Sequence, residues 1–136
     1  CYHRAKTKGK RSDKAYMEVS IPPQAMEALA RLTEDARDGY LLNLSARYYD
    51  RHTCTSYISR GITKLCKEAG LPPMTSYALR HSWATIARNE VGASEEDVAF
   101  ALNHISAHKV TDRYIRKDYA RVDKLNTEVV KLVLGE

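Results

Sequence analysis

Residues 75–85 read Thr-Ser-Tyr-Ala-Leu-Arg-His-Ser-Trp-Ala-Thr, and they set the expected architecture of this part of the chain. A threonine or serine at the start can cap a helix, so we predict one helix from here to about Asn89. Its buried stripe is expected to comprise Leu79, Trp83 and Ile86. Tyr77 and Arg80 share a different face, on which the buried helix would hold the arginine rigidly. The planar guanidinium group could then bind a carboxylate or a phosphate, or it could be an exposed group without a special role.

Helical periodicity extends outward from this stretch to most of the chain. Further helices are predicted at residues 24–36 and 53–69, after Ser94, at 110–115, and from about Tyr119 to near the C-terminus. The apolar stripes expected to face the core are Met26, Leu29, Ala30 and Leu32; Ile58, Ile62, Leu65 and Cys66; and Val122, Leu125, Val129 and Leu132. We expect one domain that spans residues 1–136.

The N-terminal residues show the pattern of a β-hairpin instead of a helix. Val19 and Ile21 alternate with polar residues, so residues 15–21 are predicted to form a half-buried strand. Residues 1–6 are its expected partner, and the polar stretch 7–14 would form the turn. The predicted fold class is therefore mostly α (α+β), with a small N-terminal β-hairpin.

Basic charge is concentrated in this hairpin. The 136 residues hold 22 Lys and Arg against 17 Asp and Glu, a net charge of +5. Residues 1–14 account for that whole excess, with Asp13 as their only acidic residue. Such a segment would attract phosphates at long range, although a solvated hairpin tip explains the charge equally well.

The expected compartment is the cytoplasm. Three cysteines without a CxxC pair indicate neither a disulfide framework nor a zinc ribbon, which suits a reducing environment. No apolar run approaches the roughly 18 residues that cross a bilayer, and there is no secretory leader. Because the chain begins at Cys1 and not at a methionine, we expect it to be a piece of a longer protein.

Four short segments occur in order along almost the whole chain. Arg4-Ala-Lys6-Thr7 precedes the basic turn and the strand, and Tyr77-Ala-Leu-Arg80-His81-Ser-Trp-Ala-Thr85 follows. Leu102-Asn103-His104 comes next, and Tyr114 stands ten residues after that histidine. These segments resemble the RxKT hairpin, the HxLRHSFAT box, the LGH motif and the nucleophilic tyrosine of the tyrosine recombinases, the phage integrase family.

The resemblance implies a site-specific recombinase that breaks and rejoins DNA to integrate or excise a mobile element. Tyr114 would attack the phosphate and form a 3′-phosphotyrosyl link, while Arg80 would hold the non-bridging oxygens. Lys6 would protonate the departing 5′ oxygen, and His104 would hydrogen-bond the phosphate or relay a proton. Tyr77 completes the implied catalytic set, and it stands at the position where the box usually has a histidine.

The implied partners are double-stranded DNA and further copies of the protein, as a tetramer on DNA. The residues expected to contact DNA are Arg4, Lys8, Lys10, Arg11, Lys109 and Arg113. This chemistry needs neither cofactor nor metal, although His104 and His108 stand four residues apart and could bind a metal on one helix face. In the resembling family a first active-site arginine lies upstream of the hairpin, so residues 1–136 alone are expected to be impaired in cleavage.

Several alternatives remain at this stage. A DNA-binding module without catalysis would use the hairpin and Arg80 as phosphate contacts alone, and a type IB topoisomerase would share the cleavage chemistry. The apolar stripe of the final helix could fold back on its own domain or pack against a neighbouring subunit, as the equivalent segment does in the resembling family. Asn103 stands where the LGH motif has its glycine, a departure without an assigned role.

Overall fold

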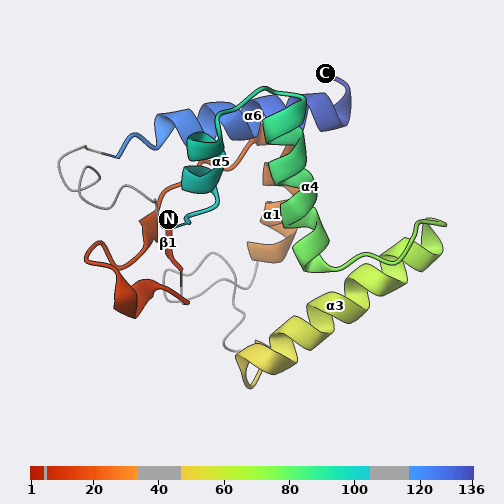
Figure 1. The fold of residues 1–136 in the computed structure, drawn as a ribbon. Helices are drawn as coiled ribbons and strands as arrows, with labels where there is room; N and C mark the ends of the chain where they lie inside the picture. Colours follow the sequence, from red (N-terminus) through yellow and green to blue (C-terminus); the bar gives the residue numbers. More distant parts are fainter. Residues whose placement is uncertain (5, 34–46, 105–116) are drawn as a thin grey trace. The chain divides into compact units, whose positions relative to one another are not determined.

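The computed structural model describes residues 1–4, 6–33, 47–104 and 117–136. These residues form five α-helices, a two-stranded antiparallel sheet and one turn of 3-10 helix (Figure 1). In chain order the elements are β1 (Tyr2–His3), η1 (Lys8–Lys10), β2 (Tyr16–Met17), α1 (Pro23–Thr33), α3 (Arg51–Glu68), α4 (Ser76–Asn89), α5 (Glu95–Ala101) and α6 (Ala120–Leu134). The prediction of a mostly helical fold with a small N-terminal hairpin is confirmed.

The described chain divides into two compact units. Residues 1–22 and 83–136 form one unit, and residues 23–82 form the other. Helix α4 belongs to both, because its first half lies in the second unit and its second half, from Trp83, lies in the first. The predicted helical turn at 110–115 lies outside the described residues.

The hairpin is shorter than the alternating pattern predicts. Tyr2 pairs with Met17 and His3 with Tyr16, and the ladder extends no further in the described residues. Beyond β2 the chain turns to α6, where the Ser20 backbone N–H and hydroxyl both donate to the Asp123 carboxylate at 2.6 Å. The predicted strand 15–21 is therefore wrong after Met17, because its second half is held by a helix.

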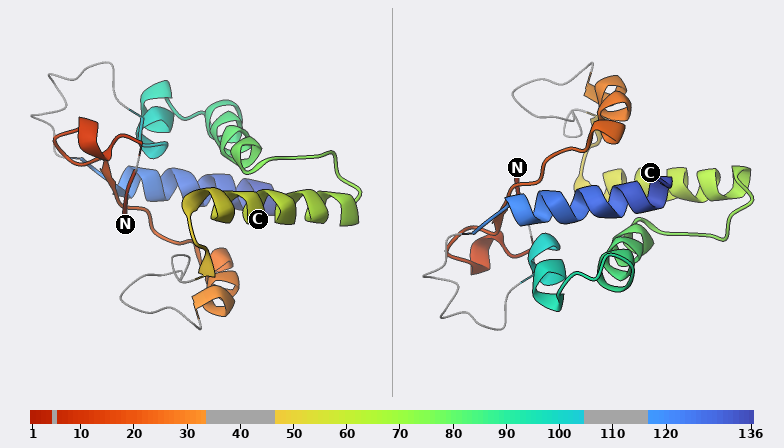
Figure 2. Two further views of the ribbon diagram at one scale, coloured as in Figure 1. Left: turned by 90° about the horizontal axis from the view of Figure 1, so that it is seen from below. Right: turned by 90° about the horizontal axis from the view of Figure 1, so that it is seen from above.

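The core of the first unit lies where α6 packs beside α5 and the second half of α4. Ala87, Leu125 and Val129 are buried there. The side chains that pack around them are Trp83, Ile86, Val91, Ala93, Val98 and Ala101. Figures 1 and 2 show α5 alongside α6 in every view, which agrees with their contacts.

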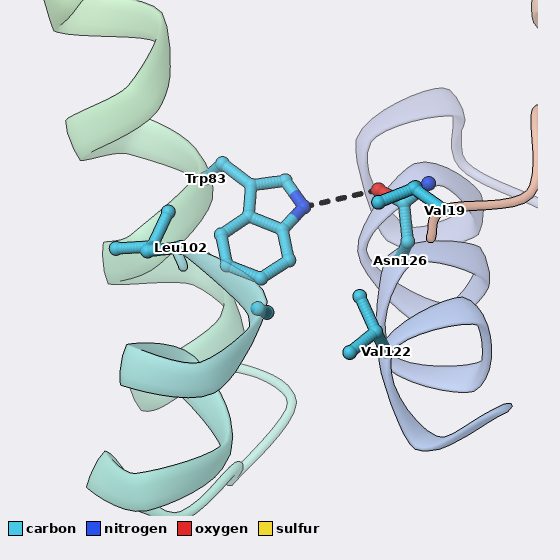
Figure 3. Close-up of a pocket in the computed structure, with 6 residues that line it drawn as sticks. Val19, Trp83, Leu102, Val122 and Asn126 are labelled. Atoms are coloured by element: carbon cyan, nitrogen blue, oxygen red, sulfur yellow. Dashed lines mark hydrogen bonds between the residues drawn. The ribbon is translucent and has the colours of Figure 1, made fainter. Parts of the chain in front are cut away.

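The stripe on α6 folds back on its own chain for most of its length. Val122, Leu125 and Val129 are buried, whereas Leu132 is 47% exposed. Trp83 Nε1 donates to Asn126 Oδ1 at 3.2 Å, beside an apolar hollow of about 100 Å³ (Figure 3). The first three residues of the stripe are thus buried within the same chain. The apolar side chains in the last turn of the helix are exposed.

Several predicted core positions are exposed instead. Leu79 is 54% exposed, whereas Trp83, one turn later on α4, packs against the buried cluster. On α3, Ile58 and Leu65 are exposed although Cys66 is buried. On α1, Met26 and Ala30 are exposed and Leu29 is half-buried. Periodicity identifies side chains that share a face, but the packing of other elements decides which turns of that face are covered.

Candidate active site

His104 follows a helix end of defined geometry. After the last residue of α5, the Asn103 backbone N–H donates to the Phe100 carbonyl at 2.8 Å and the His104 N–H donates to the Ala99 carbonyl at 2.9 Å. This pair of hydrogen bonds is the Schellman motif, which requires a left-handed residue between helix and exit. Asn103 has φ +52°, so it adopts that conformation. Asparagine tolerates it better than other residues with a side chain, which explains how it can stand in a glycine position.

The Asn103 side chain joins this turn to the N-terminal hairpin. Its Nδ2 donates to the Ala15 carbonyl at 2.9 Å, and its Oδ1 accepts from Arg11 Nη1 at 2.7 Å. Its backbone carbonyl accepts from Arg4 Nη1 at 3.0 Å. Asn103 is only 3% exposed, so these hydrogen bonds are shielded from water. The hairpin that contains Lys6 is thereby attached to the turn that contains His104.

Arg11 is committed to contacts within the protein. Its Nε and Nη2 donate to the two carboxylate oxygens of Asp13 at 2.9 and 2.6 Å, while Nη1 binds Asn103. Lys117 also pairs with Asp13. Partial burial raises the pKa of Asp13, but hydrogen bonds from Arg11, Lys117 and the Ala15 N–H outweigh it and hold the pKa well below its ordinary value. We call Arg4, Arg11, Asp13, Ala15 and Asn103 the stem network.

The lysines of the hairpin are placed differently from its arginines. Lys6, Lys8 and Lys10 are exposed, and the last two lie in η1 at the tip. Arg4 and Arg11 are half-buried. The structure therefore presents the three lysine side chains to solvent and directs both arginines towards Asn103.

The two predicted site residues of the box, Tyr77 and Arg80, lie on the first half of α4, in the second unit. Arg80 is half-buried there, and Tyr77 is 64% exposed with its ring edge-on to His81 at a centroid distance of 4.5 Å. Lys6 and His104 belong to the first unit. The other predicted site residues, Tyr114, Lys109 and Arg113, lie outside the described residues, as does His108.

Aromatic contacts add a second connection around the hairpin. The Tyr119 ring stacks on Phe100 at 5.8 Å and meets Tyr16 edge-on at 6.0 Å. Burial raises the pKa of Tyr119, and the negative charges of Glu18 and Asp13 raise it further. Together with the stem network, these rings join the hairpin, α5 and the start of α6.

Sequence reasoning missed the contacts of Asp13, Lys117 and the Asn103 side chain. Lys117 pairs with Asp13, which lies 104 residues away along the chain, and local sequence patterns do not relate residues so far apart. The sequence feature that points to these contacts is Asn103, an asparagine where the LGH motif has its glycine. Among the described residues, no three His, Cys, Asp or Glu side chains are grouped so that they could hold a metal ion.

Comparison with known proteins identifies the class. The model of the phage integrase family matches residues 2–121, which include the hairpin, α4, the His104 turn and Tyr114. The chain belongs to this family of tyrosine recombinases, enzymes that bind, break and rejoin DNA. Searches of curated proteins and of solved structures found no match. No helix in the described part of the chain is both long and apolar enough to span a membrane.

Proposed function

We propose that this chain is the catalytic domain of a site-specific recombinase that integrates or excises a mobile element. The observation that supports this most is the set of hydrogen bonds that Asn103 makes to the hairpin. Two family motifs far apart in sequence, the lysine hairpin and the histidine turn, are joined by these bonds. That attachment is expected if Lys6 and His104 act on the same phosphate.

The proposed reaction is a transesterification. The Tyr114 oxygen forms a bond to phosphorus as the bond from phosphorus to the 5′ oxygen breaks, and the hydroxyl proton passes to a base or to water. Lys6 donates a proton to the departing oxygen, and Arg80 offsets the charge on the non-bridging oxygens. A phenol, with an ordinary pKa of about 10, leaves more readily than an alcohol, so the DNA 5′ hydroxyl can reverse the step.

The remaining site residues have supporting parts in this proposal. The exposed His104 would hydrogen-bond the phosphate or relay a proton, since an imidazole titrates near neutral pH. Tyr77 would supply a hydroxyl hydrogen bond where the family usually has a histidine. In this proposal the full-length protein acts in the cytoplasm as a tetramer on double-stranded DNA.

DNA contact at the hairpin is assigned to Lys8 and Lys10 because they are exposed at its tip. Arg4 and Arg11 were predicted to bind DNA as well, but their guanidinium groups are engaged in the stem network. We therefore propose that they support the hairpin, and that Lys109 and Arg113 add to the DNA contact.

The test is covalent trapping by the full-length protein. On nicked suicide DNA the wild type should form a covalent adduct, and Tyr114→Phe should abolish it while DNA binding in a gel shift is almost unchanged. Tyr119→Phe is the matched control, because it keeps the ring and removes a hydroxyl that donates only a long hydrogen bond, 3.5 Å, to the Tyr16 carbonyl. The control should still form the adduct. An undiminished adduct with Tyr114→Phe would refute the assignment.

A further inference from the structure

The side-chain amide of Asn103 makes hydrogen bonds to the hairpin that a glycine in the same position could not make. Either residue can adopt φ +52° and complete the Schellman motif, so the backbone of the His104 turn does not require an amide. In this chain both ends of that amide are used, one by Ala15 and the other by Arg11. A buried amide with both ends paired fixes the distance and orientation between its partners.

The partner on the hairpin is an unusual piece of backbone. Lys14 and Ala15 both have positive φ, 52° and 53°, a conformation that is strained for residues with a side chain. The Ala15 carbonyl accepts from the Arg4 N–H at 3.1 Å as well as from Asn103, and the Ala15 N–H donates to Asp13 at 2.9 Å. Asn103 therefore binds the hairpin at this strained point, directly before β2.

Lys6 is close in sequence to these anchoring points. It lies two residues after Arg4, whose carbonyl accepts from the N–H groups of Thr7 and Lys8 at 3.1 and 2.9 Å. The same arginine donates its side-chain N–H to the Asn103 carbonyl. The turn that contains Lys6 is thus built on a residue whose own position depends on Asn103.

We propose that the Asn103 side chain is a positioning residue for strand cleavage, which holds the Lys6 hairpin against the His104 turn before DNA binds. This inference rests on the proposed function. The amide makes no contact with the reacting atoms in this role; it acts through Lys6 by keeping the ammonium group where the 5′ oxygen departs. Such preorganisation is valuable because displacement of a catalytic group by about 1 Å can cost about 100-fold in rate.

The experiment compares Asn103→Gly with Lys6→Ala in the full-length protein on two DNAs. One is the nicked suicide substrate, and the other is identical except that sulfur replaces the bridging 5′ oxygen at the cleaved phosphate. A thiol has an ordinary pKa of about 8.5, so a thiolate leaves without receiving a proton. Asn103→Gly should slow cleavage of the oxygen substrate by about 10- to 100-fold. On the sulfur substrate both variants should cleave at nearly the wild-type rate.

Other outcomes would overturn the inference. An unchanged rate of the glycine variant on the oxygen substrate would show that the amide is dispensable, and an equal defect on both substrates would show a general structural role. Asn103→Asp keeps the acceptor for Arg11 but loses the donor to Ala15, so it should show the same rescue by sulfur. If the donor is not needed, this variant cleaves both substrates like the wild type, which contradicts the assigned geometry.

Amide hydrogen exchange separates this inference from the proposed function. In Asn103→Gly two N–H groups beside Ala15 should exchange faster than in the wild type: that of Arg4, which donates to the Ala15 carbonyl across the hairpin, and that of Tyr16, which donates to the Asp13 carbonyl within the turn. If the wild type forms no adduct on either DNA, the proposed function fails and the catalytic role of Asn103 fails with it. If the wild type cleaves DNA but amide exchange in Asn103→Gly equals that of the wild type, only the positioning role of Asn103 is overturned.

Discussion

The N-terminal hairpin has two basic regions, its stem and its exposed edge, which we define as Lys6, Lys8 and Lys10. Arginines supply the charge at the stem and lysines supply it at the edge. At the stem, the planar fork of Arg11 binds both oxygens of Asp13 and the amide of Asn103 at once. At the edge, Lys6, Lys8 and Lys10 extend into solvent. Guanidinium suits several fixed hydrogen bonds in a half-buried place, whereas ammonium is a strongly hydrated point charge on a flexible stem. The net charge of the segment therefore does not separate the cations that bind within the protein from those presented to solvent.

Removal of Arg11 should have the largest effect on stability. Arg11→Ala leaves Asp13 with Lys117 and the Ala15 N–H, and it leaves Asn103 Oδ1 without its donor. We expect a loss of about 3 kcal/mol in the free energy of unfolding, since the lost bonds are charge-assisted and shielded. Urea unfolding measures it, with Lys10→Ala as the control expected to change stability by no more than about 0.5 kcal/mol. Equal effects of the two variants would remove the distinction between stem and edge.

The pH dependence of stability should also originate at the stem. The pKa of Asp13 is lower in the folded chain than its ordinary value of 3.8. Its contribution is therefore complete above that value and is lost as the pH falls towards the folded pKa. Below about pH 4 the wild type should lose stability more steeply than Asp13→Asn, by about 1 to 2 kcal/mol across the acid limb. Parallel curves for the two proteins would show that Asp13 is not held as described.

At the edge, the expected effect is on DNA affinity and not on folding. Lys8→Gln with Lys10→Gln should weaken DNA binding about tenfold and reduce the slope of log affinity against log salt by about 2. The melting temperature should stay unchanged because neither ammonium group lies in the stem network. Lys67→Gln with Lys131→Gln, on α3 and α6, is the charge-matched control. A salt slope that changes equally in both double variants would refute a specific role for the hairpin tip.

Local features of this fold could be predicted from sequence, and the long-range ones could not. The capping of α5 follows from Ser94, whose hydroxyl accepts the Asp97 N–H at 3.0 Å, and the bounds of α4 follow from caps and period. The bonds from Asn103 to Arg4, Arg11 and Ala15 cross 99, 92 and 88 residues. Periodicity contains no information about such pairs, so the sequence identified the lysine and histidine motifs without showing how they are attached.

The hydrogen bond between Trp83 and Asn126 gives the molecule an internal optical probe. Trp83 is the only tryptophan, and its indole lies between α4 and α6 beside the apolar hollow. The fluorescence of an indole shifts to longer wavelengths when water replaces apolar neighbours. Its emission spectrum therefore reports directly on whether α6 is docked on its own chain. No dye or added label is needed to follow that helix when DNA is added.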